Sequence, residues 1–496
     1  MRYRHRLIPP AWAAALLGAT ALASAAAHFD YPRVARGRTI DVYHGVRVAD
    51  PYRSLEDAQS AITRRFVAQQ NELAQPWLEA LPQRPWIRQR LAQLWDYERV
   101  GIPRKEGGRY FYLRNDGTQN QSVLYVSESL AAAPRVLIDP NAHRADATVA
   151  LARFEPSPDG QLLAYALADG GTDWENWRIR RVADGSDLAD ELHWTKFWEL
   201  SWARDGSGLY YSRYAQRAGA PASELRGDDQ AQPAIYFHAL GEPQERDRLV
   251  YAVAGSSTRV PSARVTDDGA WLVVTLFDGY QFNGVDLVDL RREGARPQPL
   301  FAAWDALYTV IGSEGDTFYV LTTAAAPHGR IVAVDARDPA PARWRTLVPE
   351  SAATIAEANF VGGRIVVNYV VDAHGAARVF GRDGQALADV PLPGVGTVAG
   401  FPGKSDDPET FFSYADFLTP GRVLRYDVAR NEVSLFREPK IAADTSRYVT
   451  RQVFFSSRDG TRVPLYLTMR RDLQPDGRNP TMLYGYGGFN VAVAPA

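Results

Sequence analysis

The residues whose types could do chemistry lie near the end of the sequence, in the string Tyr484-Gly485-Tyr486-Gly487-Gly488-Phe489-Asn490. A tyrosine hydroxyl on a loop can donate a hydrogen bond to the oxyanion of a tetrahedral intermediate, and one such donor typically contributes about 3 kcal/mol. Tyr486 lies between two glycines, which give its backbone the freedom to point outward. The alternative is that Tyr484 and Tyr486 are packed residues of a strand. Phe489 could likewise belong to a core or form one wall of a substrate pocket.

Other catalytic motifs are missing from the sequence. It contains no Gly-x-Ser-x-Gly nucleophile elbow, no phosphate-binding loop and no His-Glu-x-x-His zinc helix. The last histidine is His374, and the histidines are scattered, so we expect each of them to be structural. The absence of cysteine excludes disulfides, thiolate catalysis and thiol-ligated zinc.

The elements that would position Tyr486 look like the start of a domain. Residues 453–467 predict two strands joined at Asp459-Gly460, and Pro480–Tyr484 predicts a buried strand that opens onto the glycine-rich loop. A complete domain rarely ends at such a point. We interpret 441–496 as the first part of an α/β domain whose helices and remaining strands would follow Ala496.

A long β-rich region precedes this segment. Glycine turns recur 45 to 63 residues apart, each before a run of aromatic or β-branched residues, with Asp407-Pro408 as the seventh equivalent; the glycines are Gly108, Gly160, Gly206, Gly269, Gly315 and Gly363. Asp-Gly hairpins alone occur in any β protein, but this spacing suits one four-stranded blade per unit. We predict a mainly β fold with a seven-bladed β-propeller over 97–440.

The first hundred residues have two further parts. Arg2, Arg4 and Arg6 precede an apolar stretch and then small residues up to Ala27, which is the order of a secretory signal. We predict a signal peptide over 1–27 and a periplasmic or secreted protein; an uncleaved anchor is the alternative. Apolar residues at helical spacing then predict helices over 57–81 and 85–95, within an N-terminal helical segment spanning 28–96.

Bulk composition limits the possible partners. With 46% hydrophobic and 23% charged residues, the chain has the composition of an ordinary soluble globular protein. Its formal net charge is −2 and it has no basic run, which argues against a nucleic-acid partner. After removal of the leader, no apolar stretch is long enough to span a membrane.

Several motifs together resemble the prolyl oligopeptidase family of serine peptidases, over nearly all of the chain after the leader. The segment 50–57 is similar to the family's Asp-Pro-Tyr-x-Trp-Leu-Glu-Asp, with Ser54 in place of the usual Trp. Residues 115–121 resemble a motif of the first blade, 157–174 the second blade, and 456–461 the entry into the hydrolase domain. The sharpest match is 484–490, where oligopeptidase B relatives tend to carry Tyr-Gly-Ser-Tyr-Gly.

The resemblance implies a serine endopeptidase, without cofactor or metal and expected to be a monomer, that cleaves short peptides after proline. It implies that Tyr486 is the side-chain oxyanion donor and that Phe489 forms one wall of the proline pocket. It also implies that 28–96 packs with 441–496 in an incomplete α/β-hydrolase domain, and that the propeller admits oligopeptides and excludes folded proteins. The nucleophilic Ser, the Asp and the His of the family have no counterpart here, so we expect this chain by itself to be inactive.

Two alternatives remain open at this stage. One is a non-catalytic propeller that binds a partner on its face. The other is an oligopeptidase B or acylaminoacyl-peptidase relative with a different specificity.

Overall fold

The computed structural model describes residues 29–496, apart from 59, 145–147, 170–172, 199, 215–231, 257 and 487–492. The chain divides into two compact units, Met1–Gln93 and Leu94–Ala496, which are described separately. The predicted leader over 1–27 lies outside the described residues. Within the described part of the chain, no helix has both the length and the apolar character needed to cross a bilayer.

The first unit contains a β-hairpin and the two predicted helices. β1 (Ile40–Tyr43) pairs antiparallel with β2 (Val46–Ala49), and α1 (Ala61–Glu79) and α2 (Arg84–Trp95) follow. Helix α1 begins where the Ser60 side chain accepts a 3.1 Å hydrogen bond from the backbone N–H of Thr63, which satisfies one free donor of the first turn. Both helices were predicted from their apolar spacing, and α1 starts four residues later than expected because of this cap.

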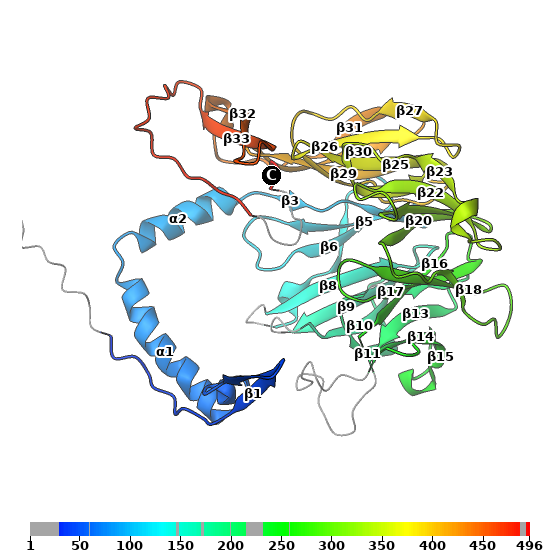
Figure 1. Ribbon diagram of the computed structural model, residues 1–496, viewed down its shortest axis with the longest axis horizontal. Coiled ribbons are helices and arrows are strands. Elements are labelled where there is room, and N and C mark those ends of the chain that lie inside the picture. The colour runs from blue at the N-terminus through cyan, green and yellow to red at the C-terminus, as the bar shows by residue number, and fades with distance from the viewer. Residues whose placement is uncertain are drawn as a thin grey trace, which may run out of the picture. The chain divides into compact units, whose positions relative to one another are not determined.

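The described part of the second unit contains seven antiparallel sheets of four or five strands, which follow one another in chain order (Figure 1), and then a two-stranded hairpin. Each sheet is built from strands that are consecutive in the sequence, so this is a seven-bladed propeller, as predicted. Blade 1 has a fifth short strand, β4, paired with β5. The blades run from Arg99 to Arg437, close to the predicted limits of 97 and 440.

The strand bounds of the first four blades are as follows. Blade 1 contains β3 (Arg99–Val100), β4 (Arg104–Glu106), β5 (Arg109–Asn115), β6 (Val123–Ser127) and β7 (Arg135–Ile138). Blade 2 contains β8 (Val149–Pro156), β9 (Leu162–Asp169), β10 (Glu175–Arg181) and β11 (Asp187–Thr195). Blade 3 contains β12 (Ser201–Trp202), β13 (Gly208–Arg213), β14 (Ala234–Ala239) and β15 (Arg248–Ala252). Blade 4 contains β16 (Val260–Val265), β17 (Trp271–Phe277), β18 (Asn283–Asp289) and β19 (Gln298–Phe301).

The remaining three blades complete the ring. Blade 5 contains β20 (Tyr308–Glu314), β21 (Thr317–Thr322), β22 (Arg330–Asp335) and β23 (Arg345–Val348). Blade 6 contains β24 (Thr354–Val361), β25 (Arg364–Val371), β26 (His374–Phe380) and β27 (Ala386–Asp389). Blade 7 contains β28 (Thr397–Gly400), β29 (Glu409–Asp416), β30 (Thr419–Asp427) and β31 (Glu432–Arg437).

The glycine turns that predicted the repeat all precede the second strand along the sheet of their blade. Each of the six glycines has a positive φ, between 59° and 80°, which an L-residue with a side chain rarely adopts. Gly160 also lies where the turns of blades 1 and 2 meet, because a Cβ added there would come within 2.7 Å of the Glu106 carbonyl oxygen. In the turn of blade 2, the Gly160 N–H donates to the Ser157 carbonyl oxygen at 2.7 Å.

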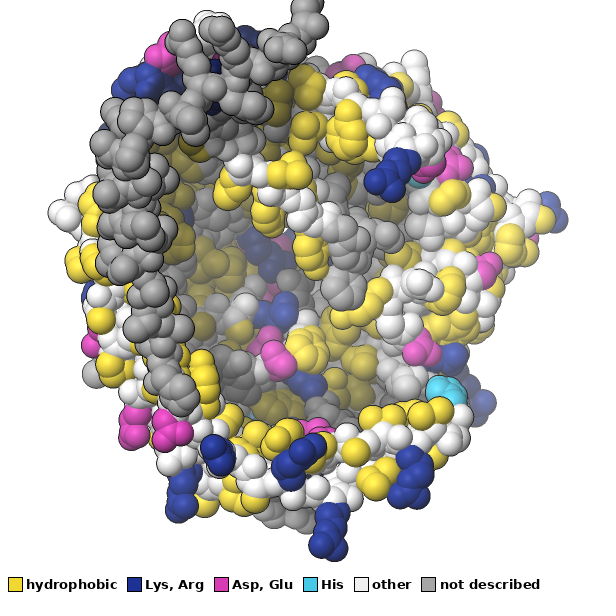
Figure 2. Space-filling view, turned by 60° about the vertical axis from the view of Figure 1, so that its left-hand side comes forward, with side chains coloured by type: hydrophobic (Ala, Val, Ile, Leu, Met, Phe, Trp, Pro, Cys, Tyr) yellow, Lys and Arg dark blue, Asp and Glu magenta, His cyan; other side chains and the backbone are white. Residues whose placement is uncertain are grey.

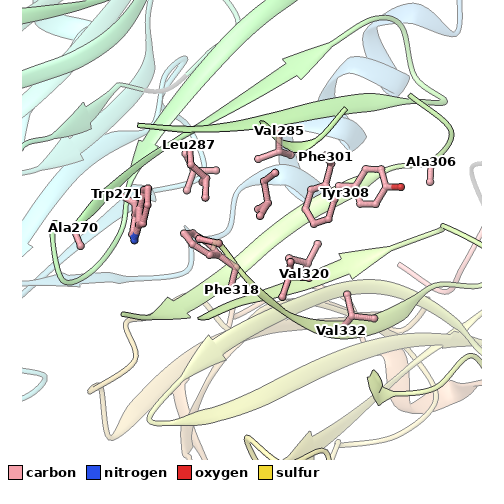
Figure 3. Packing of buried hydrophobic residues seen from close by; sticks show 14 residues of the cluster. Ala270, Trp271, Val285, Leu287, Phe301, Ala306, Tyr308, Phe318, Val320 and Val332 are labelled. Atoms are coloured by element: carbon pink, nitrogen blue, oxygen red, sulfur yellow. The ribbon is translucent and has the colours of Figure 1, made fainter. Parts of the chain in front are cut away.

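Buried side chains between neighbouring blades form the cores of the propeller. The largest core lies between blades 4 and 5, where Trp271, Phe301, Tyr308 and Phe318 pack among valines and leucines (Figure 3). Phe301 and Tyr308 stack with ring centroids 4.2 Å apart and an interplanar angle of 7°. Because aromatic and β-branched residues bury large areas on pleated surfaces, such blade cores make use of the 11% of aromatic residues in the chain.

The region after the propeller matches its prediction only in part. β32 (Tyr448–Ser456) and β33 (Arg462–Arg470) form the expected hairpin with its turn at Asp459-Gly460. The predicted buried strand at Pro480–Tyr484 is wrong for this structure, because the segment forms no strand and its side chains are exposed. A buried strand needs hydrogen-bonded neighbours and a covered face, and no described strand pairs with this segment.

Candidate functional site

Tyr486 is the predicted catalytic residue that the structure describes. Its side chain is 52% exposed and has no hydrogen-bond partner among the described residues. Phe489 falls within 487–492 and therefore lies outside the described residues. Both assignments therefore remain predictions.

The segments on either side of Tyr486 contact the blades around β28. The β32–β33 hairpin meets the turn between β25 and β26, where the Gln452 amide and the Tyr466 hydroxyl donate to the Asp372 carbonyl oxygen at 2.7 and 3.1 Å. Further along, the Thr397 hydroxyl on β28 donates to the Pro495 carbonyl oxygen at 2.6 Å. These contacts join the end of the chain to blades 6 and 7.

A cavity of about 620 Å³ lies on the axis of the propeller. Its lining comes from all seven blades, chiefly from the innermost strands and the turns that follow them. Figure 2 shows the hollow in the molecule, with basic and acidic side chains inside it among hydrophobic ones. A volume in this range suits a small ligand or a few peptide residues and is far too small for a folded protein.

Ion pairs ring one part of this cavity. Arg104 of blade 1 pairs with Glu155 of blade 2 at 2.6 Å, and Lys105 lies 3.3 Å from Glu409 of blade 7. Lys404 of blade 7 pairs with Glu106 of blade 1. Burial raises the pKa of Glu106, and the Lys404 ammonium offsets only part of that effect. The pairs therefore link blades 7, 1 and 2 around the opening.

The loop between β28 and β29 narrows the cavity. It spans 401–408, whereas the equivalent turn of blade 4 spans 266–270 and that of blade 6 only 362–363. The backbone N–H of Ser405 in this loop donates to the Asp267 carboxylate of blade 4 at 3.0 Å, and the Lys404 carbonyl oxygen accepts from Gly362 of blade 6 at 3.1 Å. The 401–408 loop of blade 7 thus crosses the axis and is hydrogen-bonded to blade 4 on the opposite side.

The sequence predictions missed these cavity residues. The signal available was the placement of charged residues in or just before the glycine turns, as in Arg104-Lys105-Glu106 before Gly107-Gly108. A charge run of this kind is usually a solvated face. Only closure of the ring turns these positions inward against acidic residues that are far away in the sequence.

One further motif has a structural explanation. Asn115, which is buried, donates a hydrogen bond from its side-chain amide nitrogen to the Gln119 carbonyl oxygen at 3.0 Å, and its side-chain oxygen Oδ1 accepts one from the Gly117 N–H at 2.9 Å. Asp116 accepts backbone N–H groups from Thr118 and Gln119. The 115–121 motif therefore shapes the turn between β5 and β6.

Comparison with known proteins identifies relatives over most of the chain. Residues 32–439 match the family model described as "Prolyl oligopeptidase, N-terminal beta-propeller domain". The prolyl endopeptidase of Elizabethkingia meningoseptica is 32% identical over 467 residues, covering 94% of this chain and 65% of that protein. Prolyl oligopeptidase A of Amanita bisporigera is 28% identical, covering 94% of this chain and 66% of that protein. The chain thus spans about two thirds of the length of these curated relatives.

Solved structures of relatives share the fold. A prolyl endopeptidase structure superposes with a TM-score of 0.85 at 31% identity, covering 93% of this chain and 68% of that one. Prolyl oligopeptidase B of Galerina marginata, bound to a 35mer hydrolysis and macrocyclization substrate, superposes with a TM-score of 0.83 at 25% identity and covers 94% of this chain and 68% of that one.

Proposed function

The chain belongs to the prolyl oligopeptidase family, and we propose that it forms the substrate-admitting part of a serine endopeptidase that cleaves short peptides after proline. The observation that carries this proposal is the axial cavity of about 620 Å³, lined by every blade and crossed by the 401–408 loop. An extended peptide fits such a passage, and a folded domain does not. The propeller then acts as a size filter in front of the catalytic groups.

We further propose that 28–96 and 441–496 contribute to one α/β-hydrolase domain. Large apolar side chains are exposed on both segments, among them Trp86 at 67% and Met482 at 89%. Large apolar side chains exposed on a segment are typical of surfaces that another part of a protein covers. A catalytic domain packed on these segments would bury them and would restrict Tyr486.

The proposed role of Tyr486 is that of an oxyanion donor, with Phe489 as a wall of the proline pocket. A serine activated by a histidine would attack the scissile carbonyl, and the Tyr486 hydroxyl would stabilise the negative charge on its oxygen. The exposed hydroxyl, without a partner among the described residues, is available to donate in this way. The triad itself would come from residues outside this sequence.

A chimera tests this proposal. The chain is joined after Ala496 to the remaining carboxyl-terminal part of the Elizabethkingia meningoseptica enzyme, and cleavage of a short proline-containing chromogenic peptide is measured beside cleavage of the same sequence within a folded protein. We expect turnover of the short peptide only, and none by the unfused chain. Equal cleavage of both substrates would contradict the size filter. A folded chimera that binds peptides without cleaving them would favour a binding module.

The same chimera tests Tyr486. Tyr486→Phe removes only the hydroxyl, so we expect kcat/KM to fall about 10- to 1,000-fold with the loss mainly in kcat and an unchanged melting temperature. Phe489→Ala should instead raise KM, because an apolar wall contributes about equally to binding of the ground and transition states. Activity within twofold of the unmodified chimera would make Tyr486 a packing residue.

We also propose export with cleavage near Ala25 to Ala27. The support is the charged, apolar and small-residue order of the first 27 residues. Mass spectrometry of the periplasmic or secreted protein should find a mature N-terminus near residue 28. Retention of Met1 or Arg2 would contradict export by cleavage.

A further inference from the structure

Two arginines that line the axial cavity differ from its other basic residues. Arg104, Lys105 and Lys404 all form ion pairs. Arg204 and Arg264 line the same cavity, and neither has an ion pair or a hydrogen bond with another described residue. Both residues are exposed. A guanidinium presents donors in a planar fork that matches a carboxylate, so these two are available for an acidic ligand.

The two arginines lie on adjacent walls. Arg264 is on β16, the innermost strand of blade 4, and Arg204 is in the turn between β12 and β13 of blade 3. These walls are in contact, because the Val265 N–H donates to the Ser201 hydroxyl at 2.9 Å. A Cβ added to Gly269 would come within 2.6 Å of the Arg204 Cβ, so the turns of blades 3 and 4 also touch.

Arg264 also borders a second cavity of about 410 Å³ between blades 4 and 5. This side cavity shares the axial cavity's wall at Ser262, Arg264 and Thr266. Most of its remaining lining is apolar, including Val273, Phe277, Leu307, Val310 and Phe360. An apolar space therefore opens beside a guanidinium that has no partner among the described residues.

We propose that Arg264, assisted by Arg204, binds a carboxylate of a peptide in the axial cavity, and that the side cavity receives the apolar side chain next to it. A C-terminal residue such as leucine carries both groups on one Cα, so the C-terminal end of a short peptide fits this pair of features best. The inference rests on the proposed function insofar as peptides must enter the propeller.

The electrostatics make this a local site and not a general positive patch. The axial cavity is lined by acidic as well as basic residues. Glu106, Glu155 and Glu409 are each paired with a basic residue, and Asp267 and Glu357 accept backbone N–H groups from Ser405 and Gly400 at 3.0 and 3.3 Å. These acidic side chains thus already have partners, whereas Arg204 and Arg264 have none among the residues that the structure describes.

The test is binding of labelled peptides to the unfused chain, which needs no catalysis. Three peptides share a proline-containing core: one ends in leucine with a free carboxylate, one is its C-terminal amide, and one is that amide with an internal glutamate. We expect the free acid to bind roughly 5- to 50-fold more tightly than the amide, the size of one charge-assisted hydrogen-bonded pair in a wet cavity. Arg264→Gln should remove this preference and leave amide binding unchanged.

Control variants separate a site from a general effect of charge or folding. Arg292→Gln removes the same charge from a side chain that is 80% exposed on a hairpin, and it should keep the preference for the free acid. Val310→Phe should fill the side cavity, and it should weaken the binding of peptides that end in leucine more than the binding of peptides that end in glycine. Circular dichroism melts check that each variant is folded.

The outcomes are distinguishable. Equal binding of acid and amide, or an Arg264→Gln effect of equal size on both, would overturn the carboxylate site while leaving peptide entry intact. Binding of the glutamate peptide as tightly as the free acid would support a carboxylate site but overturn its assignment to the C-terminus. Failure of all three peptides to bind would overturn both the site and the proposed entry of peptides through the propeller.

Discussion

The contact surface between two neighbouring blades, here called a joint, differs from place to place in the ring. The joint between blades 4 and 5 is mainly apolar, whereas the joint between blades 7 and 1 is partly polar. The first is a large apolar core that includes Trp271, Phe301 and Phe318 (Figure 3). At the second, only Tyr110, Phe411 and Val423 are buried in the cluster, and polar contacts surround them. Among the described residues, no strand from one end of the propeller joins the sheet at the other end, and side-chain contacts close the ring.

The closing joint is built around a buried carboxylate. Glu409 on β29 accepts a 2.6 Å hydrogen bond from the Tyr110 hydroxyl on β5, pairs with Arg425 and lies 3.3 Å from Lys105. An aromatic edge contact adds to it, with the Tyr110 and Phe411 ring centroids 6.0 Å apart. Apolar burial is strong but non-directional, whereas such pairs fix the register of two blades that no chain connection joins. The two joints should therefore respond differently to mutation and to pH.

The largest effect is expected in the apolar joint. Phe318→Ala removes a fully buried ring and should lower the free energy of unfolding by about 3–5 kcal/mol, through lost transfer energy and the cavity left behind. Denaturant melts monitored by tryptophan fluorescence measure this loss, with Phe282→Ala at a 42% exposed position as the control. A loss below about 1 kcal/mol would mean that the joint collapses around the cavity.

The joint between blades 2 and 3 gives a polar case within a covalently continuous part of the ring. His238 is buried between Asp247 and Asp190, with ring-nitrogen to carboxylate distances of 2.7 and 3.0 Å. Burial acts to lower the pKa of His238, but the hydrogen bonds to the two aspartates outweigh it, so the pKa is raised. His238→Gln leaves two buried carboxylates without this cation and should lower stability by about 3 kcal/mol.

The pH dependence of that effect has a definite sign. Because the folded-state pKa of His238 is raised, its stabilisation is fully present below the unfolded value of about 6.5 and is lost as the pH rises through the folded pKa. Melts of the native chain and of His238→Gln across neutral and alkaline pH should converge at high pH. The matched control is His193→Gln, at a side chain that is 44% exposed. A difference that grows with pH would contradict a charged His238.

A smaller effect is expected at the closing joint. Glu409→Gln should lower stability by about 2 kcal/mol, because it weakens charge-assisted hydrogen bonds of a buried group. Burial acts to raise the pKa of Glu409, but the bonds from Tyr110 and Arg425 outweigh it and the pKa is lowered. Its stabilisation is therefore present above the unfolded value of about 4.3 and is lost as the pH falls through the folded pKa.

Acid titration of this variant sharpens the comparison. The stability difference between the native chain and Glu409→Gln should shrink on acidification, whereas the Phe318→Ala difference should persist. Burial raises the pKa values of Glu106 and Asp407, so their contributions to stability change with pH in the direction opposite to that of Glu409. Both proteins contain these two residues, so subtracting one stability from the other at each pH cancels their contributions. Glu432→Gln, at the exposed start of β31, is the control. A loss at Glu409 equal to that at Phe318 would erase the distinction between the joints.

The smallest effect should come from Tyr110→Phe. This change removes the hydroxyl that donates to Glu409 but leaves Arg425 and Lys105 beside the carboxylate, so we expect a loss of about 1 kcal/mol. A double-mutant cycle with Glu409→Gln measures the coupling between the two side chains. Additive losses would show that the two groups do not interact in solution.

Sequence reasoning succeeded where structure is local. The turns at Gly160, Gly206 and Gly269 marked their blades correctly because each blade pairs strands that are neighbours in the chain and each turn needs a positive φ. The same holds for the helices and for the hairpin at Asp459-Gly460. It failed at Pro480–Tyr484, where an apolar run predicted a buried strand but the described chain supplies no neighbouring strand.

The sequence by itself determined the blade repeat, the helices and the family, because each depends on residue types at short and regular spacing. Only the tertiary structure decided which distant residues lie in contact. Tyr110 and Glu409 are hydrogen-bonded although almost the whole propeller sequence separates them, and Ser405 of blade 7 is hydrogen-bonded to Asp267 of blade 4. The tertiary structure also decided that Arg264 has no ion-pair partner among the described residues. These relations arise when the ring closes, and closure brings together residues whose separation in the chain leaves no periodic trace in the sequence.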